Sequence, residues 1–100
     1  MDANVNAHLE MVQAERGVAV SAYVASPETR PVRWKLELKS QSAGGSNNIA
    51  QGGVVAGEKT SPVSSVVVTQ GSRGTVTLLV YEGEQVVARD EIVFGEPSGG

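Results

Sequence analysis

The sequence predicts an all-β domain whose strands form a two-layer antiparallel sandwich. Valine is the dominant apolar residue, with 17 copies in 100 residues, and its branched Cβ packs well on a pleated sheet. Apolar and polar side chains alternate along several segments, as they do on strands with one buried face. Clusters of Gly, Pro, Ser and Asn separate these segments, which is typical of all-β domains. A chain of this length makes about one domain.

The first half of the chain predicts three strands. Residues 5–11, 18–24 and 32–39 each place apolar side chains at alternate positions. A turn at residues 15–17 and a proline-containing break at residues 26–28 separate them, because proline cannot donate to a strand ladder. The third segment has the clearest pattern: Val32, Trp34, Leu36 and Leu38 share one face, and Arg33, Lys35, Glu37 and Lys39 share the other.

The next part of the chain has a less regular pattern. We expect a flexible polar loop over residues 40–48 and then a glycine-interrupted strand over residues 49–55. Residues 57–62 contain the next break, and residues 63–69 form the fifth predicted strand. Because Val66, Val67 and Val68 make both faces of that strand apolar, we expect it to be central or covered.

Two final strands complete the prediction. After a turn over residues 71–74, residues 75–81 alternate again, and residues 85–94 form the last strand. Glu82 and Gly83 fit the two-residue hairpin turn between these strands, since glycine supplies the positive φ that such turns need.

Short strands at spacings of roughly 8–15 residues indicate two packed sheets. Trp34 lies on the third strand, where immunoglobulin-like sandwiches often bury a tryptophan, although the flanking cysteine pair is missing. We therefore expect a seven-stranded antiparallel immunoglobulin-like β-sandwich over residues 4–95, with a flexible tail at residues 96–100. A small barrel is the alternative arrangement.

Several classes of function are disfavoured by composition. The chain has no cysteine and only one histidine, His8, so thiolate or His-rich metal sites are not expected, and neither is a cofactor. No nucleophile elbow or phosphate loop is present, and Asp90 and Glu91 point to opposite faces of a strand, so we do not expect an enzyme. The net charge of −3 and the four aromatic residues disfavour nucleic acid. No apolar run approaches the roughly 20 residues that span a bilayer, and no signal peptide is visible.

One positive feature is electrostatic. Residues 30–39 carry a net charge of +3 within a chain of net charge −3. The candidate partner-binding residues are Arg30, Arg33, Lys35 and Lys39. One interpretation is a solvated sheet face whose basic residues discourage edge-to-edge aggregation. The other is a cationic stripe that meets an acidic or polar partner and speeds encounter.

The order of features from residue 34 to residue 94 resembles the periplasmic curli assembly inhibitors of the CsgC/CsgH type. The matching pieces are the charged strand at residues 32–38, the Ser/Gly loop at 42–46, Gln-Gly-Gly at 51–53, Gly-Glu-Lys at 57–59 and the hairpin at 78–88. Some relatives carry a Cys-x-Cys pair near the third strand, where this chain has none. The cysteine-free CsgH-like branch is therefore the better match.

The resemblance implies a seven-stranded immunoglobulin-like sandwich located in the periplasm. It also implies a monomer that binds the amyloid fibre subunit transiently and delays its conversion to cross-β structure. A structural or adhesive immunoglobulin-like module of a larger bacterial surface protein is the alternative function.

Overall fold

The computed structural model describes residues 5–15, 17–27, 29–42, 44–57, 62–69 and 71–95. Every regular element in this part of the chain is a β-strand, and no helix there is long and apolar enough to cross a membrane. The strands are β1 (Asn6–Ala14), β2 (Gly17–Ala25), β3 (Val32–Ser42), β4 (Gly45–Val55), β5 (Ser64–Thr69), β6 (Arg73–Glu82) and β7 (Gln85–Phe94).

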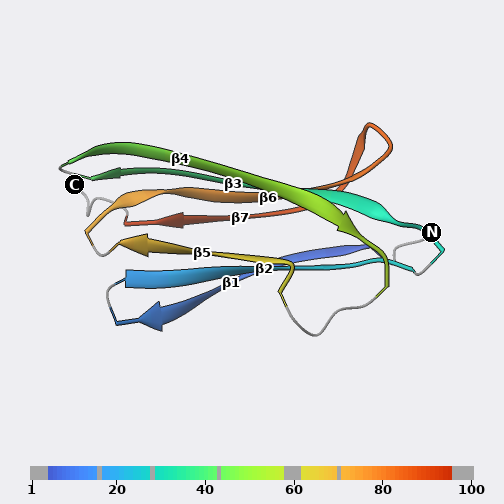
Figure 1. Cartoon of the computed structure of the whole chain (residues 1–100), viewed down its shortest axis with the longest axis horizontal. Helices are drawn as coiled ribbons and strands as arrows, with labels where there is room; N and C mark the ends of the chain where they lie inside the picture. Colours follow the sequence, from blue (N-terminus) through green and yellow to red (C-terminus); the bar gives the residue numbers. More distant parts are fainter. Residues whose placement is uncertain are drawn as a thin grey trace.

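The seven strands divide into two antiparallel sheets, which form the two layers visible in Figure 1. One sheet has the order β1-β2-β5 and the other β4-β3-β6-β7. The predicted all-β sandwich is therefore confirmed and the barrel alternative is wrong. Its immunoglobulin-like character stays a prediction, as do the domain bounds, since residue 4 and the tail at residues 96–100 lie outside the described residues.

The core lies between the sheets and consists of the inward-facing side chains of both. Its most deeply buried large members come from β2, β3 and β6: Val20, Val24, Val32, Leu36, Val76, Leu78 and Val80. Trp34 is 9% exposed and packs on this cluster. The alternation predicted for the third strand is confirmed, because Val32, Trp34, Leu36 and Leu38 are all buried.

The loop expected at residues 40–48 is wrong. Strand β3 continues to Ser42, and β4 begins at Gly45, which pairs with it directly. The polar residues of this segment show no alternation that would predict a strand. They are nevertheless extended, because pairing with β3 fixes the backbone and strand preference depends strongly on such context.

The position predicted for the fifth strand is also wrong. Strand β5 lies at the edge of its sheet, and the Val67 side chain is 64% exposed. Val66 and Val68 on the other face are buried in the core. Three consecutive valines therefore indicated burial of both faces where the fold buries only one.

Two turns are shifted relative to their predicted positions. Glu82 pairs with Gln85, so the β6–β7 hairpin turn contains Gly83 and Glu84, with φ of 64° at Gly83. A positive φ at the first turn position is the type II′ pattern, which suits the twist of a hairpin. Strand β6 begins at Arg73, inside the turn expected over residues 71–74.

We predict that Gly53→Ala destabilises the fold through Trp34. A Cβ at Gly53 would lie 3.1 Å from three atoms of the buried indole. Overpacking of a core costs about 1–3 kcal/mol, which exceeds the ~0.4–1 kcal/mol gained by restricting the unfolded chain. Urea unfolding should therefore show a lower midpoint. The control is Gly44→Ala, whose new Cβ would meet no atom within 4 Å; equal stability of the two variants would contradict the prediction.

Candidate functional site

The candidate site starts from the outward-facing side of β3. Since Trp34, Leu36 and Leu38 point into the core, the alternate residues Arg33, Lys35 and Lys39 point outward and are exposed. The structure thus brings together three of the four predicted binding residues on one face of the four-stranded sheet.

Neighbouring strands add two cations that the sequence analysis missed. Arg73 on β6 pairs with Gln41 of β3, and Arg89 on β7 pairs with Leu79 of β6, which itself pairs with Lys35. Both arginines are exposed on the same outward face. We call Arg33, Lys35, Lys39, Arg73 and Arg89 the cationic face. Two carboxylates, Glu37 and Glu91, share this face, so its net charge is +3.

The five cations differ in how strongly they are engaged. The Arg33 guanidinium donates to the Gly83 carbonyl at 2.9 Å and lies 5.8 Å from the centroid of the Tyr81 ring. The Lys35 ammonium lies 3.2 Å from Glu37. The side chains of Lys39, Arg73 and Arg89 have no ion-pair or hydrogen-bond partner within the part of the chain that the structure describes. These three charges are therefore directed to solvent.

Arg30, the fourth predicted binding residue, makes an ion pair within the fold, and its part in partner binding stays a prediction. It precedes β3, and its guanidinium donates to both carboxylate oxygens of Glu82, at 2.9 Å from Nε and 2.5 Å from Nη2. These hydrogen bonds, with the charge attraction, hold the pKa of Glu82 below its ordinary value. Arg30 thus ties the segment before β3 to the β6–β7 hairpin, which projects from the body of the molecule in Figure 1.

Two shallow hollows accompany the cationic face. The first hollow has a volume of about 580 Å³ and is lined by Gly52, Lys35, Arg33, Val54 and Tyr81. Gly52 has no side chain to fill the space between Lys35 and the sheet edge. The other, of about 470 Å³, is lined by Lys39 and Arg73 together with the polar side chains of Gln41, Asn48 and Thr75. Ammonium and guanidinium groups beside amides and hydroxyls are suited to holding carboxylates by charge-assisted hydrogen bonds.

The opposite face of the molecule has a different character. Strands β1, β2 and β5 contain no lysine or arginine. Their exposed polar groups include His8 and Glu10, joined at 3.2 Å, and Ser21 and Ser65, joined at 3.1 Å. Positive charge on the described strands is therefore confined to one side of the sandwich.

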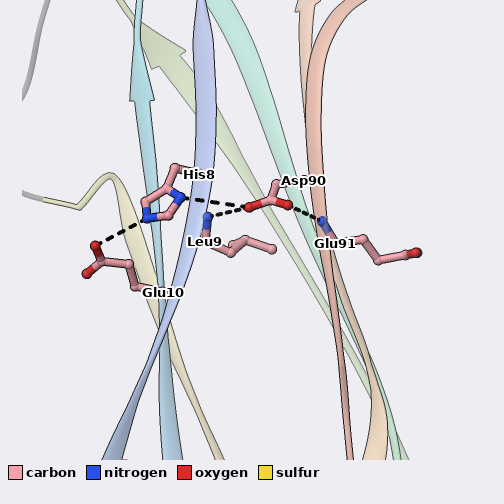
Figure 2. Close-up of polar contacts among 5 residues, drawn as sticks. All are labelled: His8, Leu9, Glu10, Asp90 and Glu91. Carbon is pink, nitrogen blue, oxygen red and sulfur yellow. Dashed lines mark hydrogen bonds and ion pairs between the residues drawn. The ribbon is translucent and has the colours of Figure 1, made fainter.

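A carboxylate bonds one backbone amide at the β1 edge. Leu9 of β1 donates its backbone N–H to Asp90 Oδ2 at 2.8 Å, and the other Asp90 oxygen accepts from the Glu91 N–H at 2.9 Å (Figure 2). His8 Nδ1 lies 4.0 Å from the same carboxylate. Asp90 therefore joins the edge of β1 to β7 across the two sheets. Glu91 instead accepts from Thr77 on the outward face, which confirms that the two carboxylates point to opposite faces.

Nowhere among the described residues do three potential metal-ligating side chains lie close together. Alternation within each strand could have placed Arg89 on the face opposite Ala88, and Arg73 on the same face as Thr75 and opposite the buried Val76. Assigning either to the same face as Lys35 needs the order β3-β6-β7, which a single sequence does not contain.

Comparison with known proteins supports the fold. No known protein-family profile and no curated protein matches the chain by sequence. Among solved structures, the chain is similar to the curli protein CsgC of E. coli, with a TM-score of 0.66 and 11% identity over 88% of this chain and 97% of that chain. It is also similar to CsgH of R. palustris, with a TM-score of 0.64 and 16% identity over 89% of this chain and 91% of that chain. The chain therefore has a fold of the CsgC/CsgH type.

We predict that Arg30→Gln raises the pKa of Glu82 toward its ordinary value, because the carboxylate would lose the guanidinium hydrogen bonds first of all and the charge attraction as well. A carboxyl with a lowered pKa stabilises the fold above its unfolded-state pKa, and this contribution disappears as pH falls through the folded-state value. Carbon-detected NMR titration of Glu82 in both proteins checks this. An unchanged Glu82 midpoint would contradict the assigned cause.

We also predict that Asp90→Ala loosens the β1 edge. The hydrogen bond from the Leu9 amide to the half-exposed Asp90 carboxylate contributes about 1 kcal/mol, less than a hydrogen bond to a buried charged group. Without this bond the Leu9 amide should exchange with solvent about fivefold faster. Hydrogen exchange by NMR measures this rate. Glu91→Ala is the matched control, because its carboxylate contacts Thr77 and not β1. Equal Leu9 exchange in the two variants would show that Asp90 does not protect this amide.

Proposed function

We propose that this protein is a periplasmic, chaperone-like inhibitor that binds the subunit of a curli-type amyloid fibre and delays its polymerisation. The observation that carries the proposal is the cationic face, displayed on a fold similar to those of CsgC and CsgH. Its mode of action is binding rather than catalysis, and the acting species is a monomer.

Electrostatics supports a transient mode of binding. Exposed charge pairs are worth about 0–1 kcal/mol each, so several cations on one face capture a partner without holding it permanently. Lys39, Arg73 and Arg89 need not break any ion pair with the described residues before they meet carboxylates of a partner. Complementary charge chiefly raises the rate of encounter, which suits the capture of early, short-lived subunit species.

Apolar groups on the same face support contact after encounter. Val54, Val86 and Val93 are 68%, 47% and 53% exposed, and their strand positions pair with Arg33, Tyr81 and Thr75 of the outward face. A partner attracted by charge thus finds apolar surface that it can cover. A face that combines cations with exposed valines suits a partner chain that is polar overall and carries scattered apolar residues.

We predict that trace amounts of the protein lengthen the lag of fibre formation at low salt and lose this effect at high salt. The Debye length falls from about 30 Å at 0.01 M to about 3 Å at 1 M ionic strength, which screens exposed charges. The double variant Lys39→Gln/Arg73→Gln should need about three- to tenfold more protein for the same lag, since two contacts of ~0.3–0.7 kcal/mol are lost. Thioflavin fluorescence measures the lag.

The matched control is Asn6→Glu/Gln13→Glu, which changes the net charge by the same amount at exposed positions on β1. It should inhibit like the parent protein. If the unmodified protein leaves the lag of fibre formation unchanged at low salt, the proposed function is wrong. Equal loss of inhibition in the variant and its control would assign the effect to net charge rather than to the cationic face.

A further inference from the structure

Among the described residues, strand β4 is an edge strand that lacks the usual protection. It lies at the outer edge of the four-stranded sheet, visible at the top of Figure 1, and runs for 11 residues. Its sequence, Gly-Ser-Asn-Asn-Ile-Ala-Gln-Gly-Gly-Val-Val, contains no charged residue and no proline. Natural edge strands are normally blunted by charges, prolines, bulges or a covering element, because a free edge pairs readily with another chain.

The other edge of the same sheet does carry such protection. Strand β7 contains Arg89, Asp90 and Glu91 and has a register shift opposite Val80 and Tyr81. Asp90 also bonds one backbone amide at the adjoining edge of β1. The lack of charge on β4 is therefore a local feature of one edge and not a general property of the sandwich.

The pairing pattern shows which β4 groups are free. Ser42 pairs with Gly45 across a two-residue turn, and the closing pair of such a turn exchanges hydrogen bonds. Because these bonds alternate along an antiparallel pair, the odd-numbered residues of β4 bond to β3. The N–H and C=O groups of the even-numbered residues face the free edge: Ser46, Asn48, Ala50, Gly52 and Val54.

Cations lie one strand in from this edge. Gly52 pairs with Lys35, Val54 with Arg33 and Asn48 with Lys39. A strand added to β4 would lie about two strand spacings, ~9.6 Å, from β3. An acidic side chain on that strand and the long Lys35 side chain would meet above Gly52, where the hollow of about 580 Å³ leaves room. The exposed Lys35–Glu37 pair that must be exchanged is worth little.

From these features we propose that the free edge of β4 binds an extended, acidic segment of the partner as an added strand, with one carboxylate over Gly52. The inference rests on the proposed function, because it names the edge and the type of segment that this partner would use. Backbone hydrogen bonds would supply affinity, and the Lys35 contact would supply specificity, as in other cases of strand addition.

Two other pairings are less favoured by charge. Strand β5 is also an edge, but it has only six residues and its neighbour β2 carries no lysine or arginine. A second copy of this chain would offer another β4, which has no carboxylate for Lys35. The acidic segment is the occupant that matches both the free edge and the cations beside it.

Amide hydrogen exchange with short peptides tests the proposal directly. The probe is an acetylated peptide of alternating threonine and glutamine with one central glutamate, and the control peptide has lysine in its place. The glutamate peptide should slow exchange at Ser46, Asn48, Ala50, Gly52 and Val54, and the lysine peptide should bind at least tenfold more weakly. Protection at β5 instead, equal binding of both peptides, or protection of β4 in the free protein that rises with its concentration would each overturn the proposal.

A proline pair separates this inference from the proposed function. Ala50→Pro removes an edge-facing N–H of β4, and Gln13→Pro introduces the same change on β1 at an edge of the other sheet. Ala50→Pro should reduce peptide affinity and lag extension at least tenfold relative to Gln13→Pro, with heteronuclear NMR spectra checking that both fold. Full inhibition by folded Ala50→Pro would overturn strand addition and leave the cationic face standing. If the unmodified protein does not inhibit fibre formation but the glutamate peptide still slows amide exchange in β4, only the proposed function is overturned.

Discussion

Strand β3 supports both the core and the cationic face. Its inward side chains, Trp34, Leu36 and Leu38, fill the space between the sheets, and its backbone pairs with β4 on one side and β6 on the other. The intervening Lys35 is outward only because these neighbours are inward. A slip of one residue would drive the cations into the core and expose the apolar side chains, at a cost that the fold does not tolerate. Folding therefore fixes the charge display, since both depend on the same alternation.

The parts of the fold that the sequence predicts well are those with one apolar and one polar face. For β3 and β7 the observed strands begin or end where the alternation does. Strand β4 has no such alternation over its polar first half, where backbone pairing with β3 keeps the chain extended; its apolar contacts with the core come from Ile49 and Val55. Val67 shows the opposite problem, since three valines in a row resemble a doubly buried strand although one face of β5 is open.

The candidate site is predictable only where it lies within one strand. Arg33, Lys35 and Lys39 share a face by local geometry, whereas Arg73 and Arg89 join them through sheet order. Arg30 is close to these residues in sequence but is held by Glu82, a contact between segments 52 positions apart. Such pairings depend on how the strands are arranged in space. The low identity to CsgC and CsgH fits this view, since alternation and sheet order preserve a fold while individual residues change.

The Asp90 bridge between β1 and β7 has a consequence for assembly. Open-ended growth of a cross-β polymer requires every unit to accept a strand on one side and offer one on the other. On the β1–β7 side, the Asp90 carboxylate occupies a β1 amide that an added strand would otherwise use. Strand addition is thereby directed to the other side of the sandwich, where β4 and β5 are the edge strands.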